Sequence, residues 1–134
     1  MNPHITDTHS LVWHLIKDPS LSIRARSVLD SADRGETCIY VPSIVLVEMI
    51  YLSEKHRVGR EVLRRATDML RDPRGSYRGI SLNLEVALLV ESVDRQIVPD
   101  MPDRIIAATA LAYKAPVLTK DSRLRAFSSI ATVW

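Results

Sequence analysis

Apolar and polar residues alternate along the chain with two different spacings. In some segments the apolar residues stand three or four positions apart, as on one face of a helix. Between these segments lie short β-branched or apolar runs, which are typical of strands. The pattern predicts helices over residues 8–16, 22–34, 44–55, 60–70, 83–93, 103–114 and 121–127. It predicts strands over residues 4–6, 37–41, 77–82, 115–119 and 131–134.

Strands and helices follow one another in this order along most of the chain. Such an order favours an α/β fold in which helices wrap a parallel sheet. In sheets of this kind, ligands bind outside the carboxyl ends of the strands. We therefore expect functional side chains at the points where strands end and helices begin.

The length and composition of the chain narrow its class. A length of 134 residues predicts a single domain over residues 1–134, and the 46% hydrophobic content argues against disorder. No run approaches the roughly 20 apolar residues of a membrane span, and the first residues lack the pattern of a signal peptide. Cys38 is the single cysteine and cannot form an internal disulfide, which points to a reducing compartment. We expect a cytoplasmic protein that does not enter a membrane.

The charge balance is close to neutral, with 18 Lys and Arg against 16 Asp and Glu and a net charge of +2. If four of the acids were gathered in one site, the rest of the molecule would carry an excess of six positive charges. Such a surface would suit an anionic polymer. Taken alone, the charge balance favours an ordinary solvated surface.

Four carboxylates stand where this fold would place its chemistry. Asp7 follows the first expected strand, Asp121 follows the strand at 115–119, and Asp103 opens a helix. Each of these three could simply cap a helix, because Asp is among the best N-cap residues. Glu48 differs, since it interrupts an apolar run and an unpaired buried carboxylate is costly. Glu48 therefore lies at the edge of a cleft with a metal or catalytic role, or it pairs with an arginine.

The four acids together predict more than each does alone. Two like charges about 5 Å apart, at an effective dielectric constant near 20, repel each other by roughly 3 kcal/mol. Several such pairs in one place require a divalent cation or protonation. Oxygen ligands alone favour Mg²⁺ or Mn²⁺ over Zn²⁺, and such ions assist the hydrolysis of phosphate esters. The residues thus point to metal-assisted phosphodiester or phosphate hydrolysis.

Four short motifs that contain these acids also resemble a known family. The segments DTHSLVW at 7–13, PSIVLVEM at 42–49, DRIIAATA at 103–110 and LTKD at 118–121 resemble PIN-domain ribonucleases, especially toxins of the VapC type. They occur in the family's order and span nearly the whole chain. The resemblance implies a PIN-like three-layer α/β/α fold with a central, mainly parallel sheet of four or five strands.

The resemblance also implies an activity, a site and partners. It implies a Mg²⁺- or Mn²⁺-dependent endoribonuclease that hydrolyses RNA with metal-activated water, leaving a 5′-phosphate and a 3′-hydroxyl. Asp7, Glu48, Asp103 and Asp121 would form the acidic site, with Asp7 and Asp103 as the direct metal ligands. Thr119 would orient Asp121 or the attacking water. The partners implied are the RNA substrate, a cognate antitoxin of a type II toxin–antitoxin module and a second copy of the chain.

Other residues near these motifs have less specific interpretations. Lys120 and Arg123 flank Asp121 and are candidates for phosphate contacts. We expect Trp13 to pack in the core rather than to stack on bases, and His9 to pack or lie on a helix surface. The basic helix at 60–70 could follow a phosphate backbone, contact the antitoxin or simply be solvated.

Three alternatives to a ribonuclease differ in what they require. A haloacid-dehalogenase-like phosphatase needs a second Asp two residues after the first, and His9 stands there instead. A response-receiver module needs adjacent acids near the first strand and an Asp after a middle strand, and neither is present. A catalytically inactive PIN-like binding module stays open, because only an assay distinguishes it from the enzyme.

Overall fold

The computed structural model describes residues 2–134. Over this range the chain forms five strands, seven α-helices and one short 3₁₀ helix. The strands are β1 (His4–Thr6), β2 (Ile39–Pro42), β3 (Tyr77–Ile80), β4 (Val117–Leu118) and β5 (Thr132–Val133). The helices are α1 (Thr8–Ile16), α2 (Ile23–Asp33), α3 (Ser43–Glu54), α4 (Arg60–Arg71), α5 (Leu84–Leu89), η1 (Val90–Ser92), α6 (Met101–Tyr113) and α7 (Ser122–Ala126).

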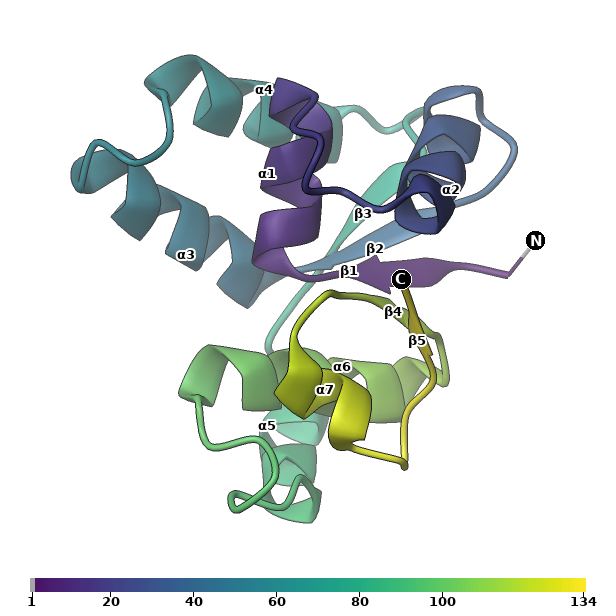
Figure 1. Cartoon of the computed structure of the whole chain (residues 1–134), viewed down its shortest axis with the longest axis vertical. Helices are drawn as coiled ribbons and strands as arrows, with labels where there is room; N and C mark the ends of the chain where they lie inside the picture. Colours follow the sequence, from purple (N-terminus) through teal and green to yellow (C-terminus); the bar gives the residue numbers. More distant parts are fainter. Residues whose placement is uncertain (1) are drawn as a thin grey trace.

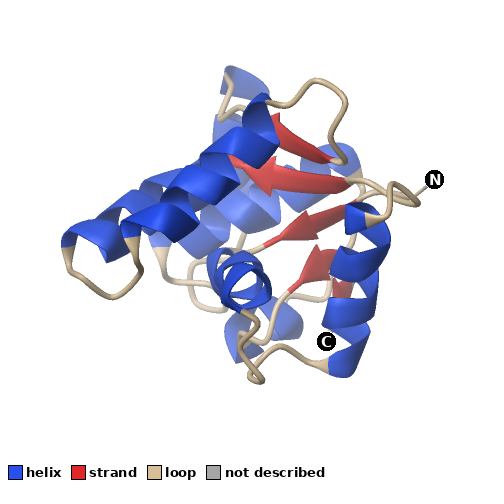
Figure 2. Ribbon diagram, turned by 90° about the horizontal axis from the view of Figure 1, so that it is seen from above, coloured by secondary structure: helices blue, strands red, loops and turns tan. Residues whose placement is uncertain are grey.

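The strands form a single sheet in the order β3-β2-β1-β4-β5, and every neighbouring pair is parallel. β1 lies in the middle, where Ile5 is in register with Tyr40 of β2 on one side and with Val117 of β4 on the other. Figure 2 shows the strands as a row of arrows with helices on both sides. Because the strands are parallel, their carboxyl ends share one edge of the sheet.

Helices cover the two faces of the sheet and make a three-layer α/β/α arrangement. In Figure 1, α1, α2, α3 and α4 lie on one side of the sheet and α5, α6 and α7 on the other. Ile5, Ile39 and Leu118 are fully buried between the layers. A second cluster, centred on Val86, Val93 and Leu124, holds α5, α6 and α7 together. The predicted fold class is confirmed.

Short polar side chains set where several helices begin. Asp7 accepts a hydrogen bond from the Ser10 backbone N–H, Ser22 accepts one from Ala25, and Asn83 accepts one from Val86. Each bond satisfies a backbone donor that has no partner within its own helix.

The apolar run around Glu48 suggests a helix buried on all sides, but α3 is buried on one side only. Val45 and Met49 are fully buried, but Val47 is 44% exposed, Ile50 is 42% exposed and Tyr51 is 59% exposed. The reason is the position of α3, which contacts α1, α4 and α6 with one side and leaves the other side uncovered.

Within residues 2–134, no helix has the length and apolar character needed to cross a membrane.

The four strands after β1 are shorter than expected, and two helices differ from their predicted bounds by more than one residue. The helix expected over residues 83–93 is interrupted, because α5 ends at Leu89 and the tighter η1 follows it. The helix expected to open at Asp103 begins at Met101 instead. Asp100 is its N-cap, and Pro102 stands in the first turn, where a proline costs no intrahelical hydrogen bond.

Candidate active site

The candidate site lies at the edge of the sheet formed by the carboxyl ends of the strands. Asp7 directly follows β1, and Asp121 follows the adjacent strand β4 by three residues. The hydroxyl of Ser10 donates to the Leu118 carbonyl oxygen at 3.1 Å, which fastens the start of α1 to β4. Asp103 comes from the first turn of α6, and Glu48 from the second turn of α3. Parallel pairing therefore gathers acids from four separate parts of the chain.

These four side chains line one pocket of about 450 Å³. The residues around it are Asp7, Thr8, His9, Trp13, Glu48, Asp100, Asp103, Lys120 and Asp121. Asp100 is a fifth acid, beyond the four that the motifs contain. In the sequence it precedes Met-Pro-Asp, and an Asp just before a Pro in the first turn is the signal of an N-cap that could have drawn attention to it.

Asp7 is the most deeply placed of these acids, with 7% of its surface exposed. Its carboxylate accepts a hydrogen bond from the Ser10 backbone N–H at 2.9 Å. Burial raises the pKa of Asp7 above its ordinary value, and the hydrogen bonds from Thr119 and Ser10 work in the opposite direction. Asp7 is therefore both the cap of α1 and a wall of the pocket, so the two roles considered for it are compatible.

Repulsion between the acids is clearest at Asp103. Its pKa is raised to about 7, first by burial and then by the negative charges of Asp121, Asp100 and the other acids of the pocket. Burial also raises the pKa of Glu48, although the Thr8 hydroxyl donates a hydrogen bond to its carboxylate and partly offsets the rise. The pocket thus holds more negative charge than its own residues neutralise.

Thr119 is fully buried and lies behind the pocket rather than on its wall. Its hydroxyl oxygen accepts a hydrogen bond from the Asp121 backbone N–H at 3.0 Å. Asp121 in turn accepts bonds from the backbone N–H groups of Arg123 at 2.8 Å and Leu124 at 3.1 Å, which begins α7. Thr119 contacts both Asp121 and Asp7 and can set their relative positions.

The basic and aromatic neighbours are placed differently from one another. Lys120 lines the pocket, whereas Arg123 is exposed on α7 and does not line it. Trp13 packs against the core, as expected, but it is only partly buried, and its ring also lines the pocket beside His9. Lys120 lies over the same ring.

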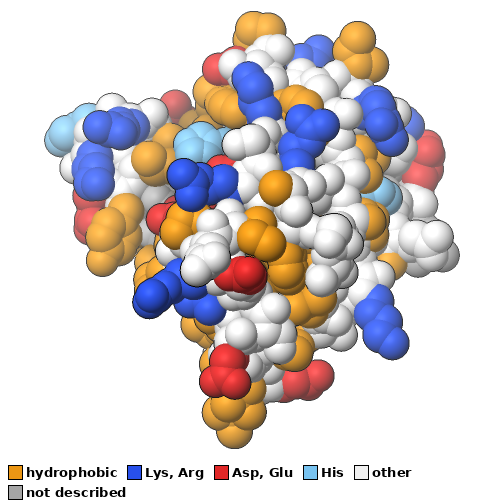
Figure 3. Space-filling model, turned by 60° about the horizontal axis from the view of Figure 1, so that its bottom comes forward, with side chains coloured by type: hydrophobic (Ala, Val, Ile, Leu, Met, Phe, Trp, Pro, Cys, Tyr) orange, Lys and Arg blue, Asp and Glu red, His pale blue; other side chains and the backbone are white. Residues whose placement is uncertain are grey.

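The donor set of the pocket fits a hard divalent cation. It offers carboxylate oxygens, without sulfur and with His9 as its one imidazole, and this composition suits Mg²⁺ or Mn²⁺. Within residues 2–134, none of the pocket carboxylates lies within 4.0 Å of a basic nitrogen. On the face drawn in Figure 3, Lys and Arg side chains lie at several separate places and do not form one continuous basic patch.

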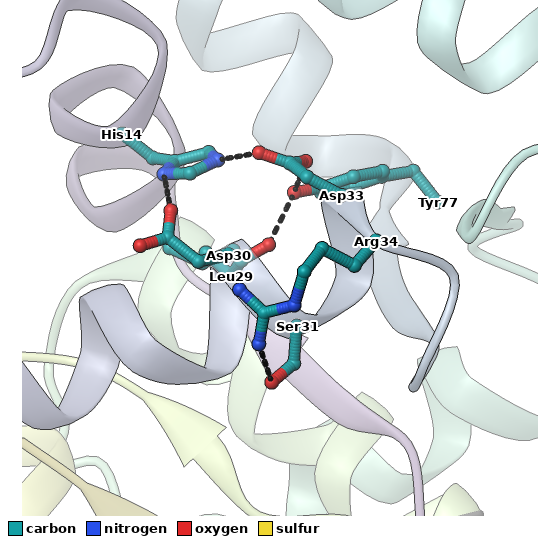
Figure 4. A network of polar contacts seen from close by, with 7 residues as sticks. All are labelled: His14, Leu29, Asp30, Ser31, Asp33, Arg34 and Tyr77. Carbon is teal, nitrogen blue, oxygen red and sulfur yellow. Dashed lines mark hydrogen bonds and ion pairs between the residues drawn. The ribbon is translucent and has the colours of Figure 1, made fainter.

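A second group of acids, outside this pocket, takes part in a network of polar contacts (Figure 4). His14 Nε2 lies 2.8 Å from an Asp33 oxygen, and His14 Nδ1 lies 4.0 Å from an Asp30 oxygen. The Tyr77 hydroxyl donates to the other Asp33 oxygen at 2.8 Å. Among the described residues, this is the one group of three whose potential ligand atoms all lie within 4.8 Å of one another. It joins α1, α2 and β3.

The fold and the acidic edge define the class of protein. Residues 5–130 match the PIN domain family, so this chain belongs to the PIN domain family. The resemblance seen in the four motifs is thereby confirmed at the level of the family.

Individual relatives agree with this assignment. The chain is 26% identical over 136 residues to Ribonuclease VapC22 of Mycobacterium tuberculosis (strain ATCC 25618 / H37Rv), and the match covers 100% of both proteins. It resembles the crystal structure of VapBC2 from Rickettsia felis bound to a DNA fragment from their promoter, with a TM-score of 0.73 and 17% identity, over 98% of this chain and 97% of that one. DNA-bound VapBC from Salmonella typhimurium gives a TM-score of 0.72 at 17% identity, over 99% and 98% of the two chains. At these identities, the two structural matches concern the fold.

Proposed function

We propose that this PIN domain is a Mg²⁺- or Mn²⁺-dependent endoribonuclease and the toxin of a type II toxin–antitoxin module. The observation that carries the proposal is the pocket in which Asp7, Glu48, Asp103 and Asp121 meet without a basic partner within ion-pair distance among the described residues. Uncompensated carboxylates cost stability, and a protein retains them where they bind a cation or act on a substrate. The full-length similarity to Ribonuclease VapC22 supports RNA as the substrate.

Asp7 and Asp103 are the residues we assign to direct contact with the cation, and Glu48 and Asp121 complete the site. A bound Mg²⁺ or Mn²⁺ would supply an activated water and stabilise the charge that develops on a phosphoryl group. Asp7 and Asp121 are held by helix-capping hydrogen bonds, so their carboxylates are oriented before any ligand arrives. Thr119 fixes the backbone at Asp121, and Lys120 contacts the RNA phosphate from the rim.

The partners follow from the named neighbours. VapBC2, VapBC from Salmonella typhimurium and a toxin–antitoxin complex from Klebsiella pneumoniae share this fold. We propose that this chain likewise binds a cognate antitoxin, that it forms a homodimer, and that it acts on RNA in the cytoplasm.

The direct test is a cleavage assay on a defined single-stranded RNA with the purified protein. We expect cleavage with Mg²⁺ or Mn²⁺, loss of cleavage with EDTA and products that end in a 5′-phosphate and a 3′-hydroxyl. Asp7→Asn should lose activity while its melting temperature stays near that of the wild type. Asp68→Asn is the matched control, because Asp68 is exposed on α4 and outside the pocket.

Three outcomes would contradict the proposal. Cleavage that persists in EDTA would remove the cation from the reaction. RNA binding without cleavage would favour the inactive PIN-like binding module, and release of inorganic phosphate from small phosphomonoesters would favour a phosphatase.

The toxin role needs a test in cells. Expression of the wild-type chain in a bacterial host should arrest growth, and Asp7→Asn should not. Co-expression with the protein encoded beside it in its genome should restore growth and yield a complex of the two chains. Growth that continues normally while the purified protein cuts RNA would separate the nuclease from the toxin role.

A further inference from the structure

Trp13 stands between two pockets on the same face of α1. One is the acidic pocket described above. The other, of about 370 Å³, lies along α1, α2 and α4. Its basic lining residues are His14, Lys17, Arg26 and Arg65, and its acids Asp30 and Asp33 are engaged by His14. Trp13 is the residue that lines both pockets. A ligand that extends from the acids toward the basic side chains can therefore contact the indole ring on its way.

Trp13 packs against the core with part of its surface, and Lys120 lies over its ring. Lys120 Nζ lies 5.9 Å from the ring centroid. Lys120 is exposed, and within residues 2–134 it pairs with none of the neighbouring carboxylates. At an exposed site, a cation over an aromatic ring is held only weakly, so this contact is readily exchanged for a stronger one.

Two aromatic rings support the indole. The ring centroids of His9 and Trp134 lie 5.5 Å and 6.0 Å from that of Trp13, both rings are tilted to it, and these contacts help to fix its position. A fixed, partly buried indole with one loosely covered face is the arrangement that binds a flat π-system. Unpaired nucleobases stack on such rings, and stacking is stronger than an exposed cation–π contact.

We propose that Trp13 is the stacking platform for a nucleobase next to the phosphate that is cut, and that Lys120 leaves the ring to contact the RNA phosphate as the base arrives. This inference rests on the proposed nuclease function and adds how the substrate is held. Stacking requires an unpaired base, so it selects single-stranded RNA. Every base has a π-face, so Trp13 favours a strand without reading its sequence.

The two tryptophans of the chain allow stacking to be observed directly. In the presence of EDTA, Trp134→Phe leaves Trp13 as the sole indole, and Trp13→Phe leaves Trp134. Titration with a short oligoadenylate should quench the fluorescence of Trp134→Phe and leave that of Trp13→Phe nearly unchanged. The same oligonucleotide with an abasic residue at the cleaved position should quench less. Equal quenching in both variants, or none in Trp134→Phe despite measured RNA binding, would overturn the proposal.

Kinetics test the same point without a spectroscopic probe. Trp13→Ala should raise KM for single-stranded RNA by roughly tenfold to a hundredfold, with a smaller change in kcat. Trp13→Phe should recover most of the loss, because a phenyl ring also stacks. Tyr113→Ala is the control, since Tyr113 is an exposed aromatic residue outside the pocket.

Different results would contradict the stacking proposal and the nuclease proposal. If Asp7→Asn is inactive but Trp13→Ala cuts and binds RNA like the wild type, the stacking proposal is wrong and the nuclease stands. If the wild type neither binds nor cuts RNA with any divalent cation, the proposed function is wrong and the stacking proposal falls with it.

Discussion

Two groups of acids in this molecule differ in what surrounds them. In the His14 network, both Asp33 oxygens have partners, one in the His14 ring and one in the Tyr77 hydroxyl (Figure 4). In the acidic pocket, the described residues place no basic nitrogen within 4.0 Å of the carboxylates, and the pKa of Asp103 is raised to about 7. The first group fastens helices and a strand together. In the second group the carboxylates repel one another, and a bound cation would reduce that repulsion.

The two groups of acids are distinguished by their partners rather than by their closeness. The His14 network brings its ligand atoms nearer to one another than the pocket acids do. A neighbouring imidazole and phenol already account for that closeness. The acids of the pocket remain apart, as expected for like charges that lack a counter-ion. Closeness alone therefore does not distinguish acids that already have partners from acids that lack them.

The largest effect should follow from Asp103→Asn. We expect cleavage activity to fall by roughly a thousandfold, because several kcal/mol of charge stabilisation correspond to that factor. The melting temperature of the cation-free variant should equal or exceed that of the wild type, since the substitution removes repulsion. Cleavage assays and calorimetry measure the two quantities. A variant that loses stability together with activity would place Asp103 with the structural acids.

A smaller effect should follow from Thr119→Val, which removes the hydroxyl behind the pocket. Groups that orient metal ligands change metal affinity by about 10- to 100-fold, so the Mn²⁺ concentration for half-maximal activity should rise by about that factor. Saturating Mn²⁺ should restore most of kcat. Thr119→Ser keeps the hydroxyl and should behave like the wild type. An unchanged Mn²⁺ requirement in Thr119→Val would reduce Thr119 to a packing role.

In the His14 network, the expected effect is on stability and not on cleavage. Tyr77→Phe removes the hydroxyl that donates to Asp33 and should cost about 1.5 kcal/mol, the scale of a hydrogen bond to a charged group. Denaturant unfolding measures this loss, and cleavage activity per folded molecule should not change. For comparison, Tyr113→Phe removes an exposed hydroxyl and should cost little. A drop in specific activity of Tyr77→Phe would mean that the His14 network contributes to cleavage as well as to stability.

A further effect concerns pH. The pKa of Asp103 is about 7 in the folded protein and 3.8 in its ordinary state, so the folded state binds more protons between these values. The contribution of Asp103 to the stability of the cation-free protein is therefore fully present below the ordinary pKa. It is lost as the pH rises through the pKa of the folded state. The raised pKa values of Asp7 and Glu48 act in the same sense. The lowered pKa of His4 acts in the opposite sense.

Because the effects of these groups overlap along the pH scale, the decisive quantity is the difference in melting temperature between Asp103→Asn and the wild type. In EDTA this difference should grow in favour of the variant from about pH 5 to about pH 8. Mg²⁺ should reverse it at the higher pH by stabilising the wild type alone. A difference that stays constant with pH would mean that Asp103 is not repelled in the folded protein.

Much of the fold and of the pocket could be predicted because local pattern and topology agree. The apolar run around Glu48 indicated a helix, and its single carboxylate marked the side that meets the cleft. Asp7 and Asp121 follow strands that a parallel sheet places side by side, so their approach followed from the topology alone. Whether the four acids catalyse a reaction remains a prediction that the experiments above address.

What the sequence could not predict depends on the neighbours that an element meets in space. The outer side of α3 is as apolar as its inner side, so composition did not show that Ile50 and Tyr51 are exposed. Trp13 has the helical spacing of a core residue and packs against the core, yet its ring also lines the pocket. Asp100 stands outside the four matched motifs, and it lines the pocket as the N-cap of α6, which begins two residues earlier than expected.

Pairing of the first strand with the fourth has a consequence for synthesis on the ribosome. β1 is made before its partner β4 and before Asp121, which lie far along the chain from it. A chain that has not yet reached β4 therefore carries Asp7 and Glu48 without the acids that finish the pocket. The cutting centre that we propose would be absent from the nascent chain until the segment through Asp121 has been made.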